Sequence, residues 1–411
     1  MSQINKLKIL NDPIYGFITI PDTLIYDLVE HPYFQRLRRI SQMGLSYLVY
    51  PGAHHTRFHH ALGCMHIMQK AIDVIRFKGT EISKEEERAL CIAILLHDIG
   101  HGPFSHAMEH SIVENVNHEA ISLLFMNKLN EEFGGQLSLA IQIFKGEYHR
   151  KFMLQLISSQ LDMDRMDYLK RDSFYSGVAE GNINSDRLIQ MMTVVDDNLV
   201  IEEKGIYSVE KFLMARRLMY WQVYLHKTSL VAELILTKAL KRAKELTEQG
   251  QDVKCGEVLL FFMKNKIELK DFNHEILNKF AQLDDFDIIN ALKSWQNHDD
   301  YILRTLSKMI LNRDLLKIKF EDQEVSDEDV KSYIAAFSQK ENISLEEAGY
   351  FVFEGKIKSQ AYNRHAEPIR ILKKDRNIQD VTIVSDQLNT EALTKPVTKY
   401  YICFPKVLVK N

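Results

Sequence analysis

Long stretches of the chain repeat apolar residues at intervals of three and four positions, which is the period of an amphipathic helix. In the segment SKEEERALCIAILLHDIG (83–100), Ser83 and Glu86 form a capping box, so a helix is predicted from Ser83 to about Ile99. Its second half is apolar on every side, and we expect a central, buried helix. The same pattern predicts further helices at 20–42, 59–78, 118–132, 136–145, 150–170, 208–248, 255–265, 273–282, 286–296, 298–318 and 326–338.

Past about residue 340 the pattern changes to short β-branched and aromatic runs separated by polar turns, which is typical of strands. These runs are GYFVFEGKIKSQAY (349–362), IRILKKD (369–375), DVTIVSD (380–386) and KYYICFP (399–405). We find no internal repeat and no low-complexity tract. The sequence therefore predicts a mainly α fold, with a helical core at 1–320 and a small C-terminal α+β subdomain at 321–411.

The composition is that of a globular protein and does not favour a nucleic-acid-binding or membrane protein. The chain is 45% apolar and 26% charged, as in globular proteins, and its net charge of −4 gives no basic field for nucleic acid or membranes. The four cysteines lie far apart without a CxxC pair, which favours free thiols in a reducing compartment. No apolar run approaches the ~18 residues of a membrane span. We expect a soluble, cytoplasmic protein.

Ten of the 16 histidines fall between positions 54 and 118. The adjacent residues His97 and Asp98, at the end of the buried helix, are candidate metal ligands. Neighbouring helical side chains project about 100° apart, so an ion bound by both must lie between them and take further ligands from other helices. Two candidates are His60 and Asp164, each in a predicted helix. Such a mixed imidazole and carboxylate set suits Mn, Fe, Ni, Zn or Mg better than a soft ion.

The order His60, His97–Asp98, Asp164 resembles that of the HD-domain metal phosphohydrolases, and especially the branch of deoxynucleoside triphosphate triphosphohydrolases. The resemblance covers roughly residues 1–320. The segments that carry it are NDPIYGFI (11–18), FQRLRRISQMG (34–44), YPGAHHTRFHHALG (50–63), LLHDIGHGPFSH (95–106), NHEAIS (117–122), LDMDRMDYLKRD (161–172), YLHKT (224–228) and ILNRDLLK (310–317).

The resemblance implies an HD-domain helical bundle that hydrolyses dNTPs, with dGTP as the candidate preferred substrate, to deoxynucleoside and inorganic triphosphate. It also implies a transition metal (Mn, Fe, Ni or Zn) at the HD ligands and Mg with the triphosphate. His106 is the expected general acid, with Glu109 orienting it from the next helical turn. His101 and His118 are expected to contact a phosphate or the attacking water.

The resemblance assigns further residues to the substrate. Phosphate contacts are expected from Arg57, Arg165, Arg216 and Lys227. Sugar contacts are expected from Gln42, Tyr168, Asp172 and Tyr224, of which Gln42 and Asp172 bind the 3′-hydroxyl and Tyr224 excludes a ribose 2′-hydroxyl.

Relatives of this kind bind an activating dNTP at a subunit interface, which implies a homo-oligomer, either dimer or tetramer. The matching positions are Lys8, Ile9, Asp12, Glu30, Gln35, Arg38, Arg313 and Lys317. The alternative is that FQRLRRI is simply an amphipathic helix with exposed arginines.

Two other functions remain open at this point. The same metal set serves other HD phosphohydrolases, such as nucleotide phosphodiesterases and 5′-nucleotidases. A nucleic-acid-binding HD protein is the alternative of a different class, and KALKRAKE (238–245) offers a modest basic face for single strands.

Overall fold

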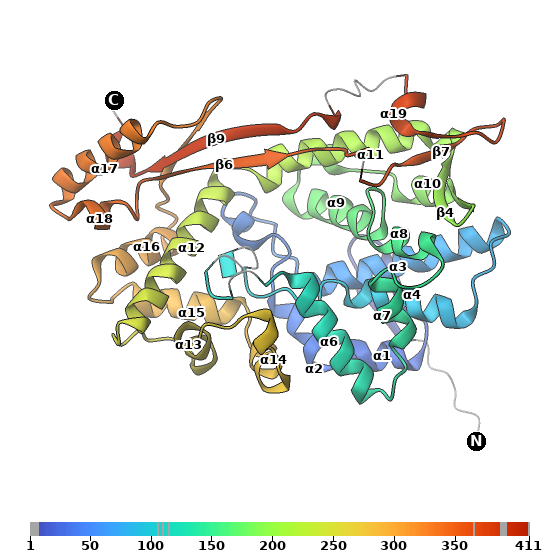
Figure 1. Ribbon diagram of the computed structural model, residues 1–411, viewed down its shortest axis with the longest axis horizontal. Coiled ribbons are helices and arrows are strands. Elements are labelled where there is room, and N and C mark those ends of the chain that lie inside the picture. Colours follow the sequence, from blue (N-terminus) through green and yellow to red (C-terminus); the bar gives the residue numbers. More distant parts are fainter. Residues whose placement is uncertain are drawn as a thin grey trace.

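The computed structural model describes residues 8–104, 107–108, 111–113, 116–364, 366–386 and 393–409. Over these residues the protein is mainly helical, with three small sheets, and the C-terminal strands lie along one side of the helical body (Figure 1). The N-terminal part was not expected to contain strands, but it forms an antiparallel hairpin. The first elements are β1 (Lys8–Asp12), β2 (Gly16–Ile20), α1 (Thr23–Glu30), α2 (Pro32–Gln35) and the 3-10 turns η1 (Arg36–Arg39) and η2 (Gly44–Leu48).

The central body packs the predicted buried helix against its neighbours. The Ser83 hydroxyl accepts from the Glu86 amide, and the Glu86 carboxylate accepts from the Ser83 amide at 2.7 Å, so the predicted capping box is confirmed. The second half of this helix is buried throughout. The helices of the body are α3 (Arg57–Phe77), α4 (Lys84–Leu96), α6 (His118–Glu132), α7 (Ser138–Phe144), α8 (Lys151–Ile157) and α9 (Met163–Ser176).

The second half of the chain begins with a short helix and a hairpin and continues with helices that surround the long α12. The elements are α10 (Ser185–Gln190), β3 (Met192–Val195), β4 (Asn198–Glu202), α11 (Ile206–Met219), α12 (Lys227–Glu248), α13 (Glu257–Lys264), α14 (His274–Phe280), α15 (Asp285–Trp295) and α16 (Tyr301–Leu311). Single 3-10 turns occupy Ala179–Gly181, Glu203–Gly205 and Leu269–Asp271.

The C-terminal segment shares two sheets with the preceding chain. The elements are β5 (Lys317–Glu321), α17 (Asp327–Glu341), α18 (Leu345–Ala348), β6 (Phe353–Ser359), β7 (Arg370–Leu372), β8 (Ile378–Asp380), α19 (Val381–Val384), β9 (Val397–Phe404) and the 3-10 turn η7 (Lys406–Leu408). Strand β9 lies between β5 and β6, and β7 pairs in parallel with β4. Because β5 begins before residue 320, the predicted domain boundary crosses a strand of this sheet.

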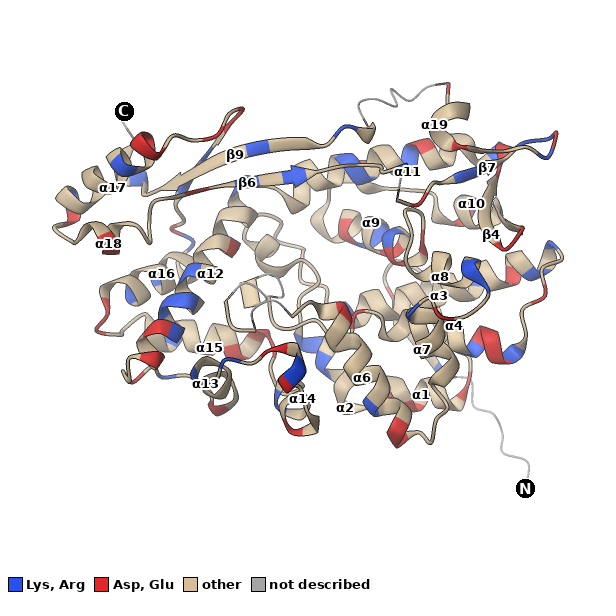
Figure 2. Cartoon of the chain, viewed as in Figure 1, with Lys and Arg blue, Asp and Glu red and all other residues tan. Residues whose placement is uncertain are grey.

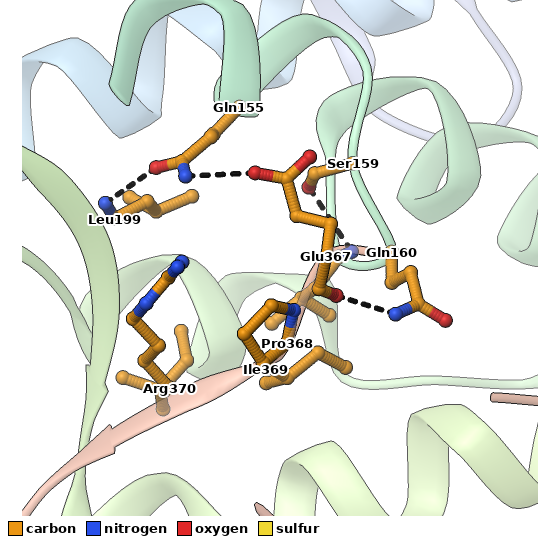
Figure 3. Close-up of a pocket in the computed structure, with 10 residues that line it drawn as sticks. Gln155, Ser159, Gln160, Leu199, Glu367, Pro368, Ile369 and Arg370 are labelled. Carbon is orange, nitrogen blue, oxygen red and sulfur yellow. Dashed lines mark hydrogen bonds between the residues drawn. The ribbon is translucent and has the colours of Figure 1, made fainter. Parts of the chain in front are cut away.

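Side-chain amides of the body hold the chain that leads into β7 (Figure 3). Gln155 donates to the Glu367 carboxylate at 2.8 Å and accepts from the Leu199 amide at 2.7 Å. Gln160 donates to the backbone carbonyls of Glu367 and Asn363. Partly buried polar contacts thus fix the C-terminal segment to α8 and to the residues that follow it.

Several predicted helices are shorter than their periodicity indicated. The helix expected at 20–42 ends at Glu30 because His31 precedes Pro32 and takes an extended backbone. The helix expected at 150–170 is two helices, and Asp162 caps the second one. The prediction at 208–248 misses a π-helical turn at Tyr220–Tyr224 and the extended His226 that caps α12.

Two further predictions fail near the C-terminal region. The helix expected at 298–318 ends at Leu311, where Arg313 takes a left-handed backbone (φ 55°), and the chain continues into β5. In DVTIVSD, Asp380 caps a helical turn over Val381–Val384 in place of the expected strand. A local side-chain cap therefore overrides strand propensity there.

Lysines and arginines are interspersed with aspartates and glutamates along most elements (Figure 2). All four cysteines are free thiols, as expected. Within the described residues, no helix combines the length and the apolar character that crossing a membrane requires.

Candidate metal centre and active site

Three helices bring the four predicted metal ligands together. His60 lies in the first turn of α3, His97 follows the last residue of α4 with Asp98 next to it, and Asp164 lies in the first turn of α9. Helix α3 packs against both α4 and α9. The ligands thus come from helix ends, where the chain places polar groups at the edge of an apolar core.

The donor atoms of these side chains lie close together, with Asp98 approaching His60 and His97 through different carboxylate oxygens. His60 Nε2 lies 3.1 Å from Asp164 Oδ1 and 3.8 Å from Asp98 Oδ2. His97 Nε2 lies 3.5 Å from Asp98 Oδ1 and 3.6 Å from Asp164 Oδ1. The predicted set His60, His97, Asp98 and Asp164 is therefore one spatial cluster.

The hydrogen bonds of the two imidazoles leave nitrogen lone pairs available to an ion. A carbonyl oxygen only accepts, so His97 Nδ1 donates to Ile94 O at 2.6 Å, and the buried His97 Nε2 makes no hydrogen bond to the described residues. His60 Nδ1 lies 2.7 Å from Asp167 Oδ2, and His60 Nε2 lies 3.1 Å from Asp164 Oδ1 on the cluster side. Donation from Nδ1 to Asp167 makes Nε2 the nitrogen whose lone pair an ion would take. This donor set fits a divalent metal. The Cys64 thiol also lies within 4.8 Å of the His60, His97 and Asp164 donor atoms.

Electrostatics keep the carboxylates of the cluster ionised, as metal ligation requires. Burial of Asp98 would raise its pKa, but His97, His101 and the Arg57 guanidinium hold that pKa well below its usual range. Burial of Asp164 would also raise the pKa of its carboxyl group, but the contacts with His60 and His97 outweigh burial and lower that pKa.

A second group of predicted residues adjoins the first through Asp98. His101 Nε2 lies 3.3 Å from Asp98 Oδ1, and the His101 ring stacks on the His118 ring with centroids 3.8 Å apart. Arg57 Nη1 donates to Asp98 Oδ2 at 2.5 Å. Burial and the positive charge of Arg57 lower the pKa of His101 well below its usual value. The predicted acid pair, His106 and Glu109, lies outside the described residues.

A buried ion-pair chain behind His60 was not foreseen from the sequence. Asp167 Oδ2 accepts from His60, and Arg171 binds both Asp167 oxygens at 2.9 and 3.0 Å. Arg171 Nη1 also donates to Asp12 Oδ2 at 2.7 Å. A Cβ atom at Gly63 would lie 2.1 Å from Asp167 Oδ1, so the row of buried ion pairs needs glycine at that position. The spacing of Asp164, Asp167 and Arg171 along α9 was the available sequence signal.

The predicted sugar-binding residues lie on one face of α9 and on the π-helical turn. Asp164, Tyr168 and Asp172 follow one another at intervals of four, which places them on the same side of the helix. The Tyr224 hydroxyl donates to Asp172 Oδ2 at 2.7 Å, and its ring meets the Tyr168 ring at 6.0 Å. Gln42 lies in the segment after η1, and its buried Oε1 has no partner among the described residues.

The remaining predicted cations differ in their surroundings. Arg165 donates to Ser159 O at 2.6 Å. Arg216 is buried and donates to Ala361 O at 3.0 Å, which ties the C-terminal segment to α11. Lys227 is exposed at the start of α12, with its ammonium 5.4 Å from the centre of the Phe320 ring.

The predicted activator residues come from two stretches of the chain. In the first, Arg38 donates to Gln35 Oε1 at 2.8 Å, and its guanidinium lies 3.6 Å from the centre of the Phe58 ring. Asp12 is buried and holds Arg171, so its carboxylate faces the interior. In the second, Arg313 donates to Leu48 O. The exposed members of both stretches are Lys8, Ile9, Glu30, Arg38, Arg313 and Lys317.

Comparison with known proteins identifies this arrangement. Residues 57–172, which include all four predicted metal ligands, match the HD domain family, and residues 183–255 match the HD associated region. A phosphohydrolase crystal structure from Bacteroides thetaiotaomicron is similar with a TM-score of 0.95, at 52% identity over 98% of this chain and 100% of that one. The chain belongs to the HD-domain phosphohydrolases.

Two sequence relatives differ in how much of their own length this chain matches. The Bacillus subtilis protein YwfO is 33% identical over 99% of this chain and 94% of its own length. The Dictyostelium discoideum deoxynucleoside triphosphate triphosphohydrolase SAMHD1 homolog is 31% identical, over 60% of this chain. The match spans 52% of that relative, so this chain corresponds to about half of its length.

Proposed function

We propose that this HD phosphohydrolase hydrolyses 2′-deoxynucleoside 5′-triphosphates at the α-phosphorus and releases a deoxynucleoside and inorganic triphosphate. The observation that carries the proposal is the common face of α9: Asp164 lies at the metal cluster, and Asp172, two turns further along this face, is the residue that we assign to the sugar. Eight residues of helix span about 12 Å, which suits a substrate with phosphate at one end and a hydroxyl further along.

The metal cluster supplies the first part of the chemistry. His60, His97, Asp98 and Asp164 would hold Mn, Fe, Ni or Zn, with Mg accompanying the triphosphate. Such an ion polarises phosphoryl oxygens and lowers the pKa of water. Arg57, which already contacts Asp98, is placed to stabilise negative charge on a phosphate beside these ligands.

The proton for the departing 5′-oxygen is the task of His106, with Glu109 as its partner, and this assignment stays a prediction. His101 and His118 support it, because they place imidazole groups next to Asp98, on the side of the cluster that adjoins Arg57. Arg165, Arg216 and Lys227 are proposed to bind the outer phosphates.

A second part of the proposal concerns activation by a dNTP bound between subunits of a dimer or tetramer. The exposed activator residues, together with Gln35, offer cations for phosphate and a carboxylate, Glu30, for the N–H groups of a base. Asp12 would act indirectly, since it links strand β1, which carries Lys8 and Ile9, to Arg171 behind the metal ligand His60.

Replacing Arg38 by Ala is expected to abolish this activation. The change removes a guanidinium that Gln35 and the Phe58 ring hold at the surface, so the ratio of activated to basal turnover should fall to about one. Turnover of each dNTP alone and in pairs measures that ratio. Metal content per chain should stay normal, and the exposed Arg88, changed to Ala, is the matched control. Undiminished activation in the Arg38→Ala protein would contradict the activator site.

The proposed reaction is tested by its products. Metal-loaded protein is incubated with each of the four dNTPs, alone and in pairs, and the products are separated by chromatography. Inorganic triphosphate together with deoxynucleoside supports the proposal. Pyrophosphate or phosphate as the first product, with metal confirmed bound, would assign the protein to a different HD phosphohydrolase reaction.

A further inference from the structure

His55 lies at one end of the proposed sugar site. Its Nε2 lies 2.7 Å from Asp172 Oδ1, and both side chains are almost completely buried. A carboxylate oxygen only accepts, so the imidazole donates. Tyr224 donates to the other oxygen of Asp172 at 2.7 Å. Burial and the negative charge of Asp172 raise the pKa of the Tyr224 hydroxyl, which keeps its proton for this bond.

The surroundings of His55 fix its ring and its backbone. The ring stacks on Tyr175 of α9, with centroids 4.4 Å apart and planes 16° from parallel. The backbone carbonyl oxygen of His55 accepts from the backbone N–H of Gln42 at 3.0 Å, and a β-bridge joins the neighbours Ser41 and Thr56. His55 is thus the point at which the Gln42 segment and α9 meet.

Two buried polar atoms of this cluster lack partners among the described residues: Gln42 Oε1 and His55 Nδ1. A buried acceptor without a donor is costly, and such atoms in a native structure call for a partner from outside the chain. Gln42 Oε1 and the Asp172 oxygens are hydrogen-bond acceptors. A ligand that binds them must therefore donate a hydrogen bond. A sugar hydroxyl meets this need and also accepts in return.

We propose that His55 is a positioning residue that aims Asp172 and Gln42 at the 3′-hydroxyl of the bound nucleotide. It acts through Asp172 by its Nε2–H and through Gln42 by its backbone carbonyl. The inference rests on the proposed function, because it takes a nucleotide as the ligand. Beyond the proposed function, the inference says that recognition of the 3′-hydroxyl depends on a histidine that need not touch the substrate.

The test compares two substitutions of His55 that differ in which imidazole nitrogen they imitate. Gln places an amide N–H near the position of Nε2 and keeps a donor for Asp172, whereas Asn reaches only the Nδ1 position and loses it. The matched control is His54→Asn, because His54 is the exposed neighbour and stacks on Tyr47. For each protein, kcat/KM is measured for the best dNTP and for its 2′,3′-dideoxy analogue, and the ratio of the two values is taken.

In the wild type, kcat/KM should be much higher for the dNTP than for its 2′,3′-dideoxy analogue. His55→Asn should lower the ratio about tenfold or more, through loss of dNTP turnover, and His55→Gln should stay within about threefold of the wild type. His54→Asn should leave it unchanged. The ratio is taken on one preparation and does not depend on the fraction of folded protein. Metal content per chain, measured alongside, should be equal in all four proteins.

Three results would overturn the positioning role. The first is an unchanged ratio in His55→Asn. The second is an equal loss for both substrates that Gln does not restore, which would make His55 a structural residue only. The third is a loss of metal from His55→Asn. If the wild type itself yields no triphosphate from any dNTP, the proposed function fails, and the role of His55 falls with it.

Discussion

Asp98→Asn is expected to lower turnover about a thousandfold or more and to deplete the protein of metal. Asp98 is the residue that joins the two halves of the site, since its oxygens lie near His60, His97 and His101 and accept from Arg57. Loss of its negative charge removes one ligand. It also leaves the Arg57 guanidinium without its carboxylate beside three imidazoles.

The measurement pairs steady-state turnover with metal per chain by elemental mass spectrometry. Asp73→Asn is the matched control, because Asp73 is an exposed carboxylate on α3, the helix that carries His60. It should leave both values near those of the wild type. Normal metal content and turnover within threefold of the wild type in Asp98→Asn would refute its place in the centre.

Arg171→Met is expected to reduce the free energy of unfolding by about 3–5 kcal/mol, the range for a broken buried ion pair. The side chains of Arg171 and Asp167 are fully buried, and that of Asp12 is nearly so. Methionine fills much of the volume but leaves two buried carboxylates without their cation. Burial favours a raised pKa for Asp167, whereas Arg171 first and then His60 hold that pKa at about 2.

The same substitution should weaken metal binding about tenfold, because Asp167 orients His60. Urea unfolding and a metal titration measure the two effects. Lys170→Met is the control, since the adjacent Lys170 is half-buried and forms no ion pair among the described residues. Equal unfolding midpoints for the two variants would show that the ion-pair chain contributes little stability.

The sequence predicted those parts of the fold that depend on local signals. The helix 118–132 has the predicted bounds, with Asn117 as its cap, and the capping box at Ser83 marked the start of α4. The break at Tyr220–Tyr224 was missed because apolar periodicity continues through a π-helical turn. The N-terminal hairpin was missed because its five-residue strands are too short for a periodic pattern to distinguish.

The candidate site divides in the same way. Its candidate metal ligands were predicted from chemically distinctive residue types in a fixed order, and the structure brings these four side chains close together. His55 and Arg171 were not recognised, because each matters through a partner more than a hundred residues away, Asp172 and Asp12 respectively. A single sequence contains no record of such pairings. Asp12 lies within a segment that resembles the family, yet only the fold reveals that its carboxylate points inward.

The central claim is that water attacks the α-phosphorus of a dNTP at this site. Its most direct test is hydrolysis in water labelled with oxygen-18, followed by mass spectrometry of both products. The proposal predicts one labelled oxygen in the inorganic triphosphate and none in the deoxynucleoside. Label in the deoxynucleoside, or a nucleoside monophosphate in place of triphosphate release, would contradict it.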